Sequence, residues 1–342
     1  MSPFLSLERI ETHLCGKSHQ EASSSPWPAA ALRGPHQSKV GVKRHGVLAR
    51  KHMKFTVQES RRAVVVAFDV EFTRAERDSK RTSQLKLCAK AKLAVAIGPR
   101  ISRIFTSDLS GTPPVHQLIP GLNTVLLNFQ PNATTNRANQ CLLVGRMEDA
   151  ELKGAPLACR AIKRVVAGQT WPHGERPSLV LRGFDSAQAD AQFAQIDPNG
   201  EFKDYVKPRA YSNDPAEVDR DIRTSALVIM PSTKEGFGLV GLDGIAAGVP
   251  VLLSIESGLA EYLLDAVSKS IIANDMAEKC LANVLYQSSD DISDDWVARM
   301  SSSLSDRQAS FARAQTLRAA LKPVMTWGNA ARDLLNAIEN SL

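Results

Sequence analysis

Charged side chains and glycines directly follow apolar runs in three segments of the sequence. In the first segment, LLVGRMEDAELKGA, Gly145 and Arg146 follow the run, and Lys153 precedes Gly154 and the next expected helix. An arginine and a lysine beside a helix N-terminus form an anion site, because the guanidinium can hold two phosphate oxygens and the ammonium adds a point charge. We therefore predict that Arg146 and Lys153 bind phosphate. A solvated pair in a loop is the alternative.

The second segment is SLVLRGFD, in which Arg182 and Gly183 end the apolar run, and the third is PSTKEGFGLVGLDG, which combines glycines with two acidic residues. Gly183 would let a ligand approach the backbone closely, although a glycine after a strand is also common in a simple turn. Glu235 opens a turn that contains Gly236 and Gly238, and Asp243 follows Glu235 by about two helical turns. Two carboxylates on one side of a cleft can bind the hydroxyl groups of a sugar and a ribose. A solvated acidic pair is the alternative.

Apolar runs alternate with helical stretches over most of the chain. We predict strands at residues 63–68, 93–98, 141–146, 178–183, 226–232 and 249–254, with helices between them and a short helix at 100–109. Such continuous apolar runs are typical of a parallel sheet that is covered on both faces. Ligands of doubly wound sheets bind beyond the carboxyl ends of the strands, where the three charged segments lie. The predicted fold class is α/β.

The chain divides into four predicted regions. Residues 1–60 form a basic, largely irregular segment, and residues 61–125 form a partial N-terminal domain that ends in a loop at 111–123 with three prolines and two glycines. Residues 126–292 form a doubly wound C-terminal domain. Residues 293–342 form two or three helices that pack back on the domains, are interrupted at Pro323, and place on their buried faces Trp296, Phe311, Leu317, Leu321 and Leu334.

Composition excludes several classes of protein. The five cysteines among 342 residues are scattered and show no metal-ligand spacing, which argues against a disulfide framework and a zinc module. No apolar run approaches the length of a membrane-spanning helix. The net charge of +6 is concentrated in residues 1–60, where nine basic residues face four acidic ones, and no interleaved aromatic residues accompany it. We predict a cytoplasmic protein without a transmembrane segment, and nucleic acid is a disfavoured partner.

The three segments together resemble the glycosyltransferase group 1 family, whose members are retaining enzymes of the GT-B fold. The matching elements are VGRMEDAELKG, LVLRG and ALVIMPSTKEGFGLVGLDGIAAGVPVLLSIESGLAEYLL. A closer likeness is to the variant domains found fused to NTPase and repeat modules in immune-receptor-like proteins. The resemblance implies a GT-B-like fold, with a Rossmann-like C-terminal donor domain and a truncated Rossmann-like N-terminal acceptor domain.

The resemblance also implies roles for individual residues. Arg146 and Lys153 would hold the donor diphosphate and stabilise the charge on the leaving nucleotide, and Glu235 would contact the donor sugar. These three are the expected catalytic residues. Asp243 replaces the family's ribose-binding glutamate, and residues 207–209 lie where the family commonly reads the base. The expected donor-binding residues are Gly145, Gly183, Arg209, Gly236, Phe237, Gly238, Leu239 and Asp243.

The implied activity is transfer of a hexose from a nucleotide-activated donor, linked to UDP or GDP, to an unknown acceptor with retention of configuration. We expect neither a metal nor another cofactor, because no Asp-x-Asp motif follows a strand and the one match, Asp219 to Asp221, falls in a predicted helix. The recognisable N-terminal part is much shorter than in the family, and no histidine follows the strand at 63–68, where Asp69 and Glu71 stand. A catalytically inactive nucleotide-sugar-binding module, or a fragment of a larger multidomain receptor-like protein, is therefore the alternative.

Overall fold

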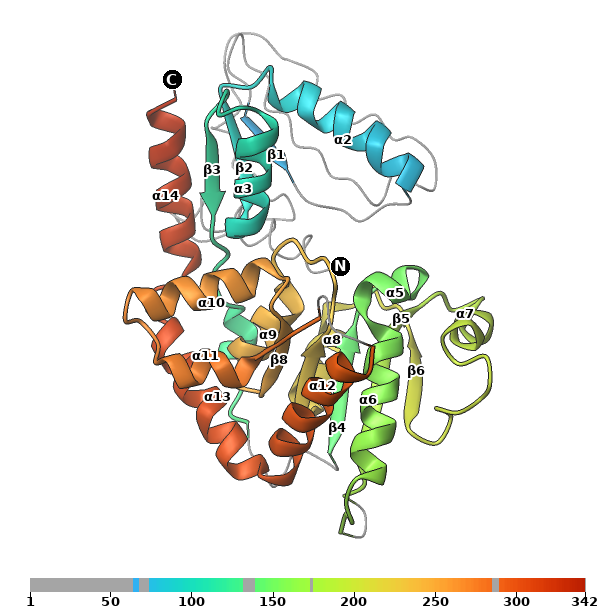
Figure 1. Ribbon diagram of the computed structural model, residues 1–342. Coiled ribbons are helices and arrows are strands. Elements are labelled where there is room, and N and C mark those ends of the chain that lie inside the picture. Colours follow the sequence, from blue (N-terminus) through green and yellow to red (C-terminus); the bar gives the residue numbers. More distant parts are fainter. Residues whose placement is uncertain (1–63, 68–73, 132–138, 173–174, 285–288, 342) are drawn as a thin grey trace, which may run out of the picture.

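Two parallel sheets organise the part of the chain that the structure describes (Figure 1). The computed structural model describes residues 64–67, 74–131, 139–172, 175–284 and 289–341. The smaller sheet has the strand order β1-β2-β3, and the larger has the order β6-β5-β4-β7-β8-β9. The predicted segment 1–60, and Asp69 and Glu71 after the first strand, lie outside the described residues.

The smaller sheet comprises β1 (Val64–Ala67), β2 (Leu93–Ile97) and β3 (Val115–Leu118). Helix α2 (Arg74–Cys88) connects β1 to β2, and α3 (Gly98–Asp108) follows β2. The predicted helix at 100–109 is confirmed, although it begins two residues earlier. The loop prediction for 111–123 is wrong at β3. Its prolines, at 113, 114 and 120, stand outside the four residues that pair with β2, so they do not interrupt the ladder.

The larger sheet comprises β4 (Gln140–Val144), β5 (Ser178–Phe184), β6 (Val206–Ala210), β7 (Leu227–Met230), β8 (Val251–Ser254) and β9 (Leu281–Ala282). After β4 the chain adds β5 and β6 on one side and then returns to add β7, β8 and β9 on the other. The order therefore reverses between β4 and β7, and a crevice forms at such a switch point.

Helices cover both faces of the larger sheet, and alternate strand residues belong to two different cores. Leu142 of β4 packs in the core beneath α9 (Leu239–Ala247), whereas its neighbours Cys141 and Leu143 pack beneath α6 (Ala155–Ala167). Around α9 lie α4 (Thr124–Leu127), α8 (Pro215–Thr224) and α10 (Gly258–Ser268), and α7 (Ala189–Ile196) lies by β5 and β6. The expectation of a doubly covered parallel sheet is confirmed.

Three helices end the chain, after the short α11 (Asn274–Cys280). They are α12 (Ser289–Ser305), α13 (Arg307–Leu321) and α14 (Trp327–Glu339), and Pro323 lies between the last two. The five apolar residues predicted on their inner faces are all buried. Helix α14 leaves the larger sheet and runs beside β3 of the smaller one (Figure 1). Among the helices of the described residues, none is long and apolar enough to span a bilayer.

The start of α3 makes contacts that join the smaller sheet to the larger one. A Cβ on Gly98, whose φ is +81°, would lie 2.3 Å from the ring of Phe237, so the absence of a side chain admits this ring. Arg100 donates to Glu256 at 2.5 Å and to Glu261 at 3.3 Å, and Arg103 donates to Glu261 at 2.6 Å. An apolar contact and a cluster of ion pairs thus join the smaller sheet's α3 to the loops and α10 of the larger sheet.

Candidate functional site

The site begins where helix α5 (Ala150–Lys153) meets the loop after β7. The backbone N–H of Thr233 donates to the carbonyl of Leu152 at 3.0 Å. Gly154 ends α5 with a φ of +70°, and a Cβ there would lie 2.2 Å from the carbonyl oxygen of Pro231. Only glycine suits both the left-handed backbone and this close approach. The two contacts hold the last turn of α5 against the segment that leads to Glu235.

Lys153 and Glu235 form an ion pair at this junction. The ammonium Nζ lies 2.9 Å from the carboxylate Oε2, and the hydroxyl of Ser232 donates to the same oxygen at 3.4 Å. The side chains are 17% and 19% exposed, so both remain accessible to a ligand while water is partly excluded. An ammonium has three donors and a carboxylate about four acceptor positions, which leaves capacity on both groups for further polar partners.

Two of the predicted glycines pack directly behind this pair. A Cβ on Gly145 would lie 2.9 Å from Cγ of Lys153, so the lysine stem crosses the end of β4. Gly183 has a φ of +130°, and a Cβ there would lie 1.7 Å from the carbonyl oxygen of Gly145. The carboxyl ends of β4 and β5 and the segments of Lys153 and Glu235 therefore meet at one edge of the sheet, as the topology predicts.

Arg146 lies beside Gly145 and forms an ion pair with Asp149 of the 3-10 helix η2 (Met147–Asp149) at 2.6 Å. Its side chain is 28% exposed. The structure thus places Arg146 next to the site with a carboxylate against its guanidinium. Its phosphate-binding role stays a prediction, and it requires the guanidinium to share its donors between Asp149 and a ligand.

The backbone around Glu235 is fixed from two sides. Its N–H donates to the carbonyl of Glu256, and its own carbonyl accepts from Gly258, both at 3.3 Å. Gly238 follows with a φ of +104°, and a Cβ on it would lie 3.6 Å from Cγ of Glu235. Helix α9 then begins at Leu239, and the first N–H groups of a helix have no partner within the helix. These donors give the edge a positive local potential.

The remaining residues predicted near Glu235 occupy different surroundings. Gly236 is half-buried in the turn, and Leu239 and Asp243 are half-buried on α9. The ring of Phe237 is buried against Gly98, so its side chain contacts the start of α3. Any contact of residue 237 with a phosphate would therefore come from its backbone, and its donor-binding role stays a prediction.

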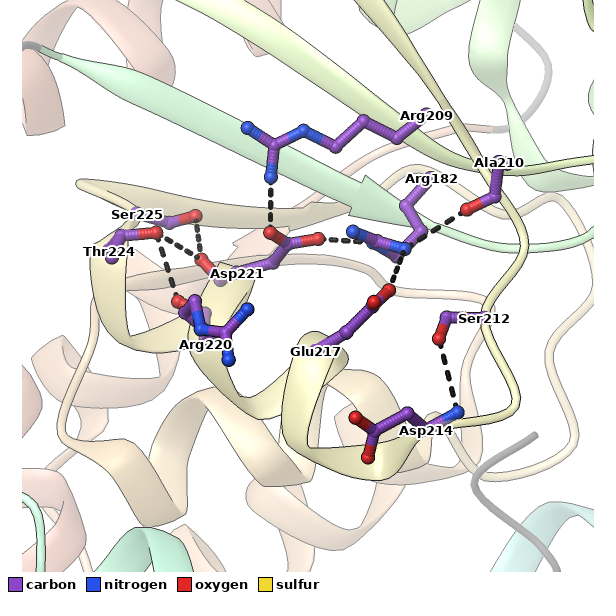
Figure 2. A network of polar contacts seen from close by, with 10 residues as sticks. All are labelled: Arg182, Arg209, Ala210, Ser212, Asp214, Glu217, Arg220, Asp221, Thr224 and Ser225. Carbon is purple, nitrogen blue, oxygen red and sulfur yellow. Dashed lines mark hydrogen bonds and ion pairs between the residues drawn. The ribbon is translucent and has the colours of Figure 1, made fainter.

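Arg209 stands in a separate network at the edge strand (Figure 2). Its Nη1 pairs with Oδ1 of Asp221, whose other oxygen pairs with Nε of the buried Arg182. Arg182 also donates to the carbonyl of Ala210 at 3.0 Å and to Glu217 at 3.3 Å. These contacts tie β5 and β6 to α8. The donor-binding role of Arg209 stays a prediction.

Sequence reasoning missed Arg182 and Asp221 as partners. In the sequence, Asp219 and Asp221 match only an Asp-x-Asp pattern, and their predicted location in a helix is confirmed by α8. The one available signal was an arginine inside an apolar strand, which requires a counter-charge when buried. Among the described residues, no group of three or more His, Cys, Asp or Glu side chains is arranged to hold a metal ion.

The geometry therefore offers a cation and a carboxylate that face each other, glycines behind them, and a helix N-terminus at their side. Such a site can bind a ligand that carries both negative charge and hydroxyl groups. The ammonium and the helix N–H groups suit phosphate oxygens, and the carboxylate suits hydroxyl donors.

Comparisons with known proteins point in the same direction. The family described as "Family 4 Glycosyltransferase in conflict systems" matches residues 51–334. A curated relative, D-inositol 3-phosphate glycosyltransferase of Kineococcus radiotolerans, is 28% identical over 171 residues, which cover 46% of this chain and 38% of that enzyme. The chain thus matches well under half of the length of this relative.

Solved structures share the fold at low sequence identity. Sucrose-phosphate synthase of Thermosynechococcus elongatus has a TM-score of 0.58 and 18% identity, over 79% of this chain and 64% of that one. A point mutant of S. aureus TarM, in complex with Fondaparinux, alpha-GlcNAc-glycerol and UDP, has a TM-score of 0.56 and 12% identity, over 76% and 46%. These likenesses confirm the predicted GT-B-like α/β fold.

Proposed function

The chain belongs to the family 4 glycosyltransferases in conflict systems, and we propose that it transfers a sugar from a nucleotide-activated donor to an acceptor with retention of anomeric configuration. The observation that carries this proposal is the ion pair of Lys153 with Glu235 at the carboxyl edge of the larger sheet. This pair combines the charge needed for a diphosphate with an acceptor for sugar hydroxyls. On the sequence resemblance, a finer proposal is that the chain is one of the variants that are fused to NTPase and repeat modules.

On the donor side, Lys153 would bind the diphosphate and neutralise the negative charge that grows on it as the bond to the sugar breaks. Arg146 lies at the same strand end and would add a second cation. The N–H groups at the start of α9 would contact the same phosphates. Groups fixed before the reaction lower the barrier because they need no rearrangement at the transition state.

On the sugar side, the Glu235 carboxylate would accept hydrogen bonds from hydroxyl groups of the transferred hexose. Asp243, farther along α9, would reach the ribose. Its side chain is one methylene shorter than the glutamate of the resembling family, so we expect the weaker contact of the two. A base at the β6 edge would lie near residues 207–209, where Arg209 is already held by Asp221.

We further propose that the reaction needs no metal ion. Lys153, Arg146 and the α9 N-terminus carry positive charge at the place where other enzymes use a divalent cation. The donor would be linked to UDP or GDP; the TarM structure, which shares the fold, contains UDP. Activity that survives EDTA supports metal independence, whereas activity that returns only with Mg²⁺ or Mn²⁺ contradicts it.

The experiment is a panel of UDP- and GDP-linked sugars against the purified full chain, with two readouts. Thermal stability reports binding, because a ligand of the native state raises stability by mass action. Release of free nucleoside diphosphate reports turnover. A stability increase together with release, both lost or strongly reduced in Lys153→Ala but kept in the exposed neighbour variant Lys234→Ala, supports the proposal.

A nucleotide-sugar-binding module without turnover is the second candidate. Two observations favour it: the smaller sheet has three strands among the described residues, and the chain matches 38% of the curated relative's length. Binding without release, across sugar phosphate, lipid and protein acceptors, would support the module. If no sugar nucleotide raises the stability of the wild-type chain, both candidates fail.

A further inference from the structure

A pocket lies at the opposite edge of the larger sheet from Lys153 and Glu235. It has a volume of about 360 Å³ and is lined by residues that precede β8, by the end of α9, and by α11, α12 and α13. Glu235 follows the carboxyl end of β7, whereas Val249 and Pro250 precede the amino end of β8. Because these strands are parallel, the two sites are about 13 Å or more apart along the strand direction.

The floor of this pocket is apolar. It is formed by Ile245, Val249, Val251 and Leu317, which are all buried in the main core. A volume of this size lies at the lower end of the range for small-molecule sites. The floor would therefore accept a short apolar group and remove it from water.

The wall of the pocket carries more positive than negative charge. Three cations, Lys279, Arg299 and Arg313, line it together with one carboxylate, Asp295. The Asp295 carboxylate already has two hydrogen-bond partners: it accepts from Nε of Arg299 at 2.6 Å and from the backbone N–H of Asn283 at 3.0 Å. Arg299 also donates to the carbonyl of Glu278 at 2.7 Å. Arg299 and Asp295 thus neutralise each other.

The other two cations lack a counter-charge among the described residues. Arg313 donates to the hydroxyl of Ser310 at 2.8 Å, which is a neutral partner, and no carboxylate of the described residues forms an ion pair with Arg313 or Lys279. Cys280 also lines the pocket, and burial raises the pKa of its thiol to about 12 although Arg313 opposes the shift. The thiol is therefore neutral near pH 7 and supplies no counter-charge.

We propose that this pocket binds a small amphipathic anion, whose apolar body lies on the Ile245, Val249, Val251 and Leu317 floor and whose carboxylate or phosphate is held by Arg313 and Lys279. The hydroxyls of Ser302 and Ser310 line the same pocket and add hydrogen-bonding groups. The site is independent of the proposed sugar transfer, because it shares no residue with the donor edge.

The test uses the full chain and four probes in calorimetric titrations: hexyl phosphate, hexanoate, inorganic phosphate and 1-hexanol. We expect one of the two amphipathic anions to bind at one site per chain, about tenfold or more tightly than inorganic phosphate or hexanol, because only it engages floor and wall together. Comparing hexyl phosphate with hexanoate identifies the head group. Equal binding of hexanol, or no binding of either anion, would overturn the proposal.

Two substitutions locate the binding. Arg313→Gln and, on the exposed side of α11, Lys279→Gln should each weaken the anion about tenfold, the loss expected for one charge-assisted hydrogen bond. Arg332→Gln removes the same charge at an exposed position of α14 outside the pocket lining, and it should leave affinity unchanged. Lys279→Gln keeps the test valid if Arg313→Gln fails to fold. Equal weakening by all three variants, or displacement of the probe by UDP, would contradict the proposed location.

Discussion

Lys153 and Glu235 stand 82 residues apart in the sequence, yet Nζ and Oε2 are 2.9 Å apart in the structure. Without a ligand, each of the two groups that would bind the donor has the other as a partner. A diphosphate must therefore compete with Glu235 for the ammonium, and sugar hydroxyls must compete with Lys153 for the carboxylate. This competition separates the roles of the two residues experimentally.

Glu235→Gln should separate nucleotide binding from sugar transfer. The substitution removes the charge that competes for Lys153, so affinity for UDP or GDP alone should stay the same or increase, while turnover of the sugar nucleotide falls by about 100-fold. Lys153→Ala should weaken both the nucleotide and the sugar nucleotide by about tenfold or more. Asp243→Asn should change either quantity far less. Titrations with each ligand and nucleotide-release assays measure these effects, and parallel losses of nucleotide affinity in both variants would refute the competition.

Gly183 should not tolerate a side chain. Gly183→Ala places a methyl group 1.7 Å from the Gly145 carbonyl oxygen at a φ of +130°, so we expect a loss of about 3 kcal/mol or more from strain and overlap together. Gly111 is the matched control, because its φ is +75° but nothing lies within 4 Å of an added Cβ. Gly111→Ala should cost about 1 kcal/mol. Urea unfolding compares the two, and equal costs would show that the contact with Gly145 has no effect.

The positions of Lys153, Glu235, Gly145 and Gly183 could be predicted from the sequence for a physical reason. Each follows or flanks an apolar run, and parallel strands bring their carboxyl ends to one edge. Which side chains then pair could not be predicted, because a pair depends on side-chain rotamers and on distances of a few ångströms. The sequence predicts phosphate as the partner of Lys153 and Arg146, and the structure gives each of them a carboxylate partner.

Short edge strands were also beyond sequence reasoning. β6 reads VKPRA, and its side chains are mostly exposed, so it has neither an apolar run nor alternation to mark it. β3 lies between prolines, and β9 has two residues. Such strands exist because a neighbouring strand offers free backbone groups, which is information that the local sequence does not contain.

Asp221 should contribute more to the free energy of unfolding than a carboxylate in a surface ion pair does. It is nearly fully buried and pairs with both Arg182 and Arg209 (Figure 2). Among the described residues, Asp221→Ala leaves the buried Arg182 with Glu217 as its one acidic partner. We expect a loss of about 3 kcal/mol or more. Asp265→Ala removes an exposed partner of Lys269 and should cost less than about 1 kcal/mol. Equal unfolding midpoints for the two variants would show that the buried network contributes no more than a surface pair.

Arg100 should hold the smaller sheet against the larger one. Its guanidinium, on α3 beside the smaller sheet, forms ion pairs with Glu256 and Glu261 beside the larger sheet. Arg100→Gln should therefore increase the radius of gyration in X-ray scattering at low salt and leave the unfolding midpoint nearly unchanged. High salt should produce part of the same increase in the wild-type chain, because ions screen partly exposed pairs. Arg81→Gln is the control, since its partner Asp108 lies beside the same sheet. An unchanged radius in Arg100→Gln would contradict the role.

Two buried thiols, those of Cys141 and Cys159, should resist modification and should reduce stability at high pH. Burial raises the pKa of Cys141 and Cys159 to about 12, so each is almost entirely a thiol at pH 8 and reacts slowly with reagents that attack the thiolate. In the unfolded chain the same thiols ionise near pH 9. The unfolded state therefore loses protons first as the pH rises from 9 toward 12, and the free energy of unfolding should fall over this window.

Thiol titration with a chromogenic disulfide at pH 8, on the native and on the urea-unfolded chain, measures the resistance to modification. Rapid reaction of these two cysteines in the native chain would show that they are not protected, and replacing both by alanine should flatten the fall in stability above pH 9.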